Sequence, residues 1–167
     1  MNCPFCQNHR IAKPEILSPL TRELTPYELV QNVLDLGLNS VAFTYNEPTL
    51  QAKFICYAAT VLQENDIAIV LVTNGAMSNK AVSEFISCLG STGAVNIDIK
   101  AFSDETYNIL GGNLKAVKNN IEGFIQTGIH IELTHLVVPG FNDTMKELYN
   151  ALETILNETD YRGKVRK

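Results

Sequence analysis

Residues 68–75, AIVLVTNG, decide the fold class of this 167-residue chain. The run is apolar and rich in β-branched residues up to Thr73, and it stops at Asn74 and Gly75, as expected for a buried strand that ends in a turn. Ser78 can then cap a helix, which carries an apolar stripe at Val82, Phe85, Ile86 and Leu89. A strand that leads directly into an amphipathic helix is a βα unit, and βα units build parallel sheets.

The same pattern recurs along the chain. Three more apolar runs are expected to be strands, at residues 40–44, 94–99 and 130–138. Capping signals and apolar stripes predict the other helices, which begin at Pro26 after a Thr25–Glu28 capping box, at Pro48, at Asp104, at Leu114 and after Thr144. Repeated βα units form either an open doubly wound sheet or a barrel, and periodicity alone leaves both open.

Composition narrows the class of protein further. Hydrophobic residues make up 46% of the chain and charged residues 19%, which is typical of a folded globular domain and excludes a disordered one. The net charge of −5 argues against a nucleic-acid-binding surface, and no apolar run approaches the roughly 20 residues of a membrane-spanning helix. No charged and apolar leader follows Met1. We therefore expect a cytoplasmic protein that binds neither nucleic acid nor membrane.

Polar side chains gather where the expected strands end. Glu47 follows the first strand, Thr73 and Asn74 end the second, and Asp98 and Lys100 lie at the end of the third. The fourth run is followed by residues 139–142, PGFN. Because the carboxyl ends of the strands form the active face in parallel α/β folds, these groups are predicted to converge on one site.

Two cysteines lie three residues apart near the start of the chain. The spacing of Cys3 and Cys6 suits zinc, an iron–sulfur cluster or a dithiol redox site. A zinc site could add His9 as a third ligand, although no second cysteine pair lies nearby. A glutaredoxin-like site would follow a strand, whereas only two residues precede Cys3. The pair alone leaves these alternatives open.

Five segments together resemble the radical S-adenosylmethionine (radical SAM) enzymes. In chain order they are CPFCQN at 3–8, AFTYNEPT at 42–49, VTNG at 72–75, NIDIKAF at 96–102 and VVPGFND at 137–143. The branch they resemble includes pyruvate formate-lyase activating enzyme, in particular its AmmeMemoRadiSam subgroup, where Tyr-Asn-Glu-Pro replaces Gly-Gly-Glu-Pro. The resemblance implies an α/β fold over residues 1–156, a partial (βα) TIM-type barrel with parallel strands that lacks the first and last strands of the family fold. We expect a poorly ordered tail over residues 157–167.

The resemblance also implies two cofactors, a [4Fe–4S] cluster and S-adenosylmethionine. Cys3 and Cys6 match the second and third cysteines of a C-x3-C-x2-C cluster loop, whose first cysteine has no counterpart here. The family pattern further assigns roles in binding S-adenosylmethionine. These fall on Phe5 for the adenine, Glu47 for the methionine amino group, Thr73 and Asn74 for the ribose or methionyl part, Asp98 and Lys100 for the carboxylate neighbourhood, and Val138 and Pro139 for the adenine edge.

The implied activity is reductive cleavage of S-adenosylmethionine followed by hydrogen abstraction from an unidentified substrate, as in an oxidoreductase-type radical enzyme. The relatives suggest a glycyl-radical protein as substrate and a flavodoxin or ferredoxin as electron donor. Two other functions fit the same residues. One is a non-catalytic remnant of the barrel, and the other is a dithiol oxidoreductase that works through Cys3 and Cys6.

Several of these residues also have purely structural interpretations. Glu47 can stabilise a helix N-terminus, and Asp98 with Lys100 can form a structural ion pair. We expect Cys56 and Cys88 to be packed within their helices, and His135 to be a packed or hydrogen-bonded strand residue. Asn142 and Asp143 are expected to cap the last helix.

Overall fold

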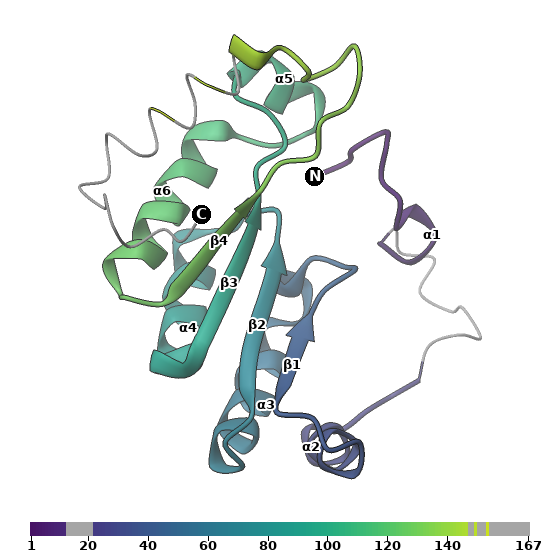
Figure 1. Cartoon of the computed structure of the whole chain (residues 1–167), viewed down its shortest axis with the longest axis vertical. Helices are drawn as coiled ribbons and strands as arrows, with labels where there is room; N and C mark the ends of the chain where they lie inside the picture. The colour runs from purple at the N-terminus through teal and green to yellow at the C-terminus, as the bar shows by residue number, and fades with distance from the viewer. Residues whose placement is uncertain (13–21, 147–148, 150–152, 154–167) are drawn as a thin grey trace.

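The four expected strands form one parallel sheet. The computed structural model describes residues 1–12, 22–146, 149 and 153. Its strands lie side by side in chain order (Figure 1), and they are β1 (Ser40–Phe43), β2 (Ala68–Thr73), β3 (Gly93–Asp98) and β4 (His130–Thr134). Each strand pairs with the next one along the chain, so all four carboxyl ends lie at one edge of the sheet. That edge is where the sequence places the polar residues.

The helices are α1 (His9–Ala12), α2 (Pro26–Asp35), α3 (Ala52–Glu64), α4 (Asn79–Leu89), α5 (Asp104–Ile109) and α6 (Leu114–Gln126), with short 3-10 helices η1 (Pro48–Gln51) and η2 (Gly90–Thr92). Helices α2, α4, α5 and α6 begin where their capping signals predict, whereas Pro48 begins a 3-10 helix and the α-helix that follows it begins at Ala52. The Thr25–Glu28 capping box is formed at the start of α2, and Ser78 accepts a hydrogen bond from the backbone N–H of Ala81 in α4. These caps satisfy backbone donors that the first helical turn leaves without partners.

The helix arrangement decides between barrel and doubly wound sheet. Helices α2, α3, α4 and α6 contact one another in chain order and lie together on one face of the sheet, whereas its other face is open (Figure 1). A doubly wound sheet reverses its strand order at one point and carries helices on both faces. Neither feature occurs in the part of the chain that the structure describes. The fold is therefore an α/β partial barrel, as predicted.

Strand β4 is shorter than the sequence suggests. The apolar run continues to Val138, but the strand ends at Thr134. The carbonyl of Thr134 accepts a hydrogen bond from the Ile99 backbone, and in the next residue the His135 side chain, rather than the backbone, bonds to the Ile99 carbonyl at 2.6 Å. His135 also stacks on Phe102, with ring centroids 4.7 Å apart. It is packed and hydrogen-bonded as expected, but in a loop.

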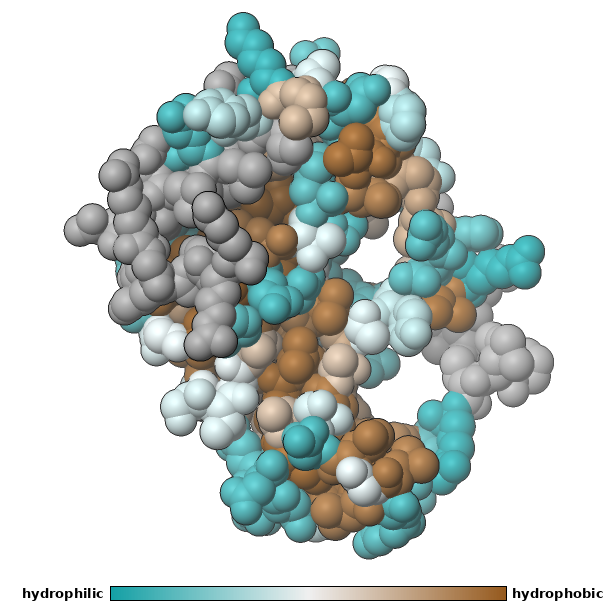
Figure 2. Space-filling model, viewed as in Figure 1, coloured by the Kyte–Doolittle hydropathy of each residue, from teal (hydrophilic) through white to brown (hydrophobic). Residues whose placement is uncertain are grey.

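The core lies between the sheet and its helices. Ile69, Leu71, Val95 and Ile97 point to the helix face and are almost fully buried. Each such side chain contributes about 1.5–3 kcal/mol of transfer free energy. On the open face, hydrophobic surface covers the middle of the sheet (Figure 2), while a polar pair bridges β3 and β4, with Thr134 Oγ1 donating to Asn96 Oδ1 at 3.1 Å.

The expectation for Cys56 and Cys88 is wrong in one respect. Both are half-buried in α3 and α4, but they are joined by a disulfide rather than packed separately. Because the two helices lie side by side, the Cα atoms come within 5.2 Å, a separation that a disulfide spans. A single sequence carries no signal for this pairing across 32 residues.

Two expectations lie outside the described residues. The first is the apolar stripe expected for the last helix, which falls largely on residues 147–148, 150–152 and 154–155. The second is the expected tail at residues 157–167. Every helix within the described ranges is too short or too polar to cross a lipid bilayer.

Candidate functional site

Glu47 ties the tips of β1 and β2 together. Its Oε1 accepts hydrogen bonds from the hydroxyls of Thr49 and Thr73, both at 2.7 Å, and its Oε2 accepts one from the Asn74 backbone at 3.0 Å. It also caps η1 through the backbone of Thr49. Glu47 therefore does stabilise a helix N-terminus, as its structural interpretation predicts, and this is part of its role. Oε2 accepts this one hydrogen bond within the described residues, so it has lone-pair capacity for a ligand at the carboxyl ends of the strands.

The residue two positions before Glu47 has an unusual backbone. Tyr45 has φ = 69° and a side chain that is 68% exposed. Residues with a Cβ pay about 1–2 kcal/mol in this left-handed region, whereas glycine does not. The Gly-Gly-Glu-Pro form of this segment in the resembled enzymes has glycine at the position of Tyr45. The left-handed backbone at this position explains why glycine suits it.

Tyr45→Gly is expected to stabilise the protein by about 0.5–1 kcal/mol, because relief of the left-handed strain exceeds the entropy that glycine adds to the unfolded chain. Urea unfolding measures this difference. Leu36→Gly serves as the control, since Leu36 is equally exposed but has φ = −85°. It should destabilise, and a loss of stability in Tyr45→Gly would contradict the expectation.

The cysteine loop lies against the tip of β3. The backbone N–H of Asn2 donates to the Leu110 carbonyl at 2.8 Å, which anchors the loop beside α5. Burial raises the pKa of the Cys3 thiol, while the nearby Lys100 ammonium acts to lower it. Cys3 and Cys6 are both half-buried and outside any disulfide. The thiols are therefore on the same edge of the sheet as the predicted polar groups.

Asp98 and Lys100 form an ion pair at this edge. The Lys100 ammonium donates to Asp98 Oδ2, and both side chains are largely buried. Asp98 Oδ1 is buried without a hydrogen-bond partner among the described residues. The structural interpretation of the pair thus accounts for one carboxylate oxygen and leaves the other available. An unpaired buried acceptor is costly, and a ligand donor would relieve that cost.

Tyr107 lies beneath this pair and was not predicted. Its hydroxyl accepts a hydrogen bond from the Lys100 backbone at 3.2 Å, and burial raises its pKa to about 12. The phenol is therefore neutral and holds the backbone of Lys100 in place. No sequence signal identifies it, because a tyrosine in a short helix is typical of ordinary packing.

The loop after β4 completes the edge. Phe5 of the cysteine loop packs edge-on against Phe141, with ring centroids 5.2 Å apart. Val138 is half-buried and Pro139 exposed, next to the turn that Gly140 forms at φ = 75°. The structure thus brings Phe5 to the loop that contains Val138 and Pro139.

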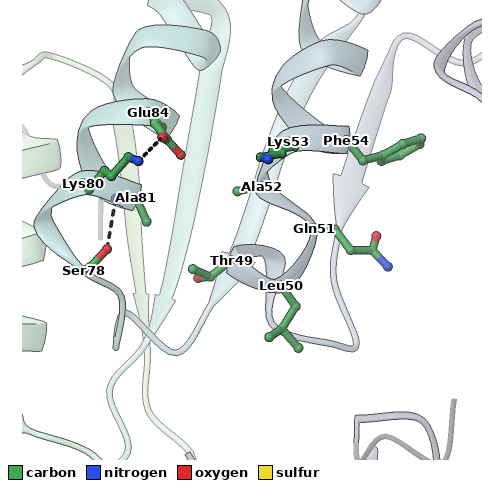
Figure 3. Close-up of a pocket in the computed structure, with 10 residues that line it drawn as sticks. All are labelled: Thr49, Leu50, Gln51, Ala52, Lys53, Phe54, Ser78, Lys80, Ala81 and Glu84. Atoms are coloured by element: carbon green, nitrogen blue, oxygen red, sulfur yellow. Dashed lines mark hydrogen bonds and ion pairs between the residues drawn. The ribbon is translucent and has the colours of Figure 1, made fainter.

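A separate cavity of about 600 Å³ lies between the starts of η1–α3 and α4 (Figure 3). Its polar lining includes Lys53 and Lys80, and Lys80 pairs with Glu84 at 3.9 Å. It contains none of the predicted site residues, and we assign it no ligand.

Comparison with known proteins identifies the family of this chain. The family description of the radical SAM superfamily matches residues 1–152. The chain belongs to the radical SAM superfamily. Members of this superfamily use a [4Fe–4S] cluster and S-adenosylmethionine.

Two curated relatives come from methanogenic archaea. An uncharacterized protein of Methanocaldococcus jannaschii is 29% identical over 157 residues, which are 93% of this chain and 45% of the relative. A probable GTP 3',8-cyclase of Methanococcus aeolicus is 29% identical over 156 residues, which are 87% of this chain and 50% of the relative. The chain thus spans about half the length of the curated relatives it matches.

Two solved structures share the fold. TYW1 with a lysine-pyruvate adduct bound aligns with a TM-score of 0.56 at 15% identity, covering 77% of this chain and 46% of that one. Archaeal TYW1 aligns with a TM-score of 0.55 at 15% identity, covering 84% and 56%. At this identity the likeness supports the partial barrel and no shared substrate.

The donor set tests how well the family's cluster fits these residues. Cys3 and Cys6 supply two thiols at the correct spacing for cluster ligands. Within the described ranges, no group of three or more Cys, His, Asp or Glu side chains could hold a metal. These residues therefore provide two of the three thiolates that such a cluster uses.

Proposed function

We propose that this chain provides the cofactor-binding part of a radical SAM enzyme, with Cys3 and Cys6 as cluster ligands and the carboxyl edge of the sheet as the S-adenosylmethionine site. The observation that carries the proposal is the position of the cysteine loop: Phe5, which lies between Cys3 and Cys6, packs on Phe141 of the loop after β4, with ring centroids 5.2 Å apart. When bound, the reduced cluster supplies the electron that cleaves S-adenosylmethionine, the family's route to hydrogen abstraction.

The remaining side chains are suited to hold the methionine part of S-adenosylmethionine. Glu47 Oε2 can accept a hydrogen bond from the amino group, since a carboxylate favours an ammonium partner. Lys100 supplies a positive charge near the expected carboxylate, and Asp98 Oδ1 is an acceptor without a hydrogen-bond partner among the residues that the structure describes. Thr73 and Asn74 adjoin Glu47 and complete this group.

The aromatic pair Phe5 and Phe141, with Val138 beside it, offers an apolar surface for the adenine. Burial of an aromatic base against such side chains excludes water from the site, which protects reactive radicals.

The test is anaerobic reconstitution of the protein in the full length that its gene encodes. We expect a brown protein whose visible absorption changes when S-adenosylmethionine is added, and 5′-deoxyadenosine after reduction. A colourless protein that exchanges thiols with disulfides would instead establish the dithiol oxidoreductase. A colourless protein without exchange would establish a non-catalytic remnant.

The finer proposal is an activity similar to that of pyruvate formate-lyase activating enzyme, an oxidoreductase-type reaction on a glycyl-radical protein with electrons from a flavodoxin or ferredoxin. The motifs at 42–49 and 137–143 support it. The probable GTP 3',8-cyclase among the relatives gives the competing substrate. Incubation with either substrate, with a glycyl-radical electron paramagnetic resonance signal or loss of GTP as readout, separates the two.

A further inference from the structure

Three polar residues are buried in the described part of the chain, and all three lie at the carboxyl edge of the sheet. They are Thr73, Asn120 and Asn142, with 2–4% of their surface exposed. Buried polar groups are expensive unless they are hydrogen-bonded, so each needs a specific partner. Thr73 bonds to Glu47, as described above. Asn120 comes from α6 and Asn142 from the loop after β4.

Asn120, on α6, holds the loop after β2. Its Nδ2 donates to the carbonyls of Gly75 at 2.8 Å and Met77 at 2.9 Å. Gly75 has φ = 70°, and a Cβ there would lie 3.1 Å from Val117 on the same helix. The loop therefore packs closely against α6, and the side-chain amide of Asn120 donates hydrogen bonds to the carbonyls of both Gly75 and Met77.

The loop that Asn120 holds also carries predicted ligand-binding groups. The backbone N–H of Asn74 donates to Glu47 Oε2, and the N–H of Gly75 donates to Thr73 Oγ1 at 3.1 Å. The carbonyl that Asn120 binds belongs to Gly75, the residue next to Asn74. A shift of this loop would therefore move the donor that orients the Glu47 carboxylate.

Asn142 performs the same task at the other end of the site. Its Nδ2 donates to the carbonyls of Lys100 at 2.8 Å and Leu136 at 2.9 Å, and its Oδ1 accepts from the Val138 backbone at 2.6 Å. One side chain thus joins the loop after β3 to the loop after β4. The expectation that Asn142 caps a helix misses this role, because its partners lie up to 42 residues away.

We propose that Asn120 and Asn142 are positioning residues that hold three strand-tip loops in the geometry needed to bind S-adenosylmethionine. Within the described residues, the hydrogen bonds of both side chains go to backbone groups, which are carbonyls for Asn120 and two carbonyls and one N–H for Asn142. Only an amide supplies two donors on one planar nitrogen with an acceptor beside it, so neither Asp nor Leu can replace it. The choice of ligand rests on the proposed function, whereas the loop geometry does not.

The test compares Asn120→Asp and Asn120→Ser with Asn119→Asp in the full-length protein. Asn119 is the exposed neighbour on α6, so its substitution makes the same charge change without touching the loop. Hydrogen exchange of amides 74–77 reports the loop, and the change in the reduced cluster's electron paramagnetic resonance spectrum on titration with S-adenosylmethionine reports binding. Val61→Ala, a core variant on α3, controls for a general loss of stability.

In Asn120→Asp we expect exchange of the loop amides to rise, and the S-adenosylmethionine affinity to fall, by about tenfold each. Asn120→Ser keeps one donor and is the gentler change. Its exchange rate and its affinity should lie between those of Asn120→Asp and those of the wild type. Asn119→Asp and Val61→Ala should leave the loop protected and the affinity unchanged.

Loop exchange in Asn120→Ser that matches Asn119→Asp would overturn the proposal, as would changes no larger than those of an equally destabilised Val61→Ala protein. If the wild type gives no spectral change with S-adenosylmethionine, the proposed function fails. The exchange comparison, made without any ligand, still decides whether Asn120 holds the loop.

Discussion

Glu47→Ala is expected to destabilise the protein by about 2–4 kcal/mol and to abolish S-adenosylmethionine binding. The carboxylate accepts hydrogen bonds from Thr49, Thr73 and Asn74, and the Thr73 hydroxyl is buried. Removal of the acceptor leaves that donor without its partner, and hydrogen bonds to charged groups contribute about 1.5–3 kcal/mol each. Urea unfolding measures the first effect, and titration of the reconstituted full-length protein measures the second.

Glu47→Gln separates the structural role from the ligand role. The glutamine carbonyl can still accept from Thr73 and Thr49, so we expect a loss of only about 1–2 kcal/mol. The charge that favours an ammonium is gone, and affinity should fall by about tenfold or more. Glu64→Gln, an exposed change on α3, is the control. Wild-type affinity in Glu47→Gln would show that Glu47 serves the fold alone.

The elements with local signals were predictable from the sequence. Strand β2 begins and ends at the residues that the apolar run indicates, and the Thr25 and Ser78 caps start α2 and α4 as expected. These features depend on contacts between residues close in sequence. The convergence of Glu47, Thr73 and Asn74 was also predictable, because parallel pairing places successive strand ends side by side.

The features that depend on distant partners were not predictable. Asn120 reaches a loop 45 residues earlier, and the disulfide joins Cys56 to Cys88 across 32 residues. Tyr107 and Asn142 likewise derive their roles from backbone groups of the strand-tip loops. The end of β4 at Thr134 is set by the same kind of contact, in which the His135 side chain replaces a ladder bond. A hydropathy pattern carries none of this information.

Anaerobic reconstitution of the 167-residue chain is expected to give iron well below the four atoms of a complete [4Fe–4S] cluster. Two thiolates, Cys3 and Cys6, are available where the family uses three. Cys3→Ser and Cys6→Ser should each reduce the bound iron further, to the background of protein treated without sulfide. Iron and acid-labile sulfide analysis measures both quantities.

The matched control is the double variant Cys56→Ser, Cys88→Ser. This variant also removes sulfur atoms, but from α3 and α4. It should leave the bound iron unchanged, since these residues are on the helix layer and joined to each other. A full, stable complement of iron in the 167-residue chain would contradict the prediction. It would require a third ligand beside Cys3 and Cys6, and no such group of three is present among the described residues. Iron retained in Cys3→Ser and lost in the double variant would place the ligands on the helix layer, which would remove the link between the cysteine loop and the carboxyl edge of the sheet.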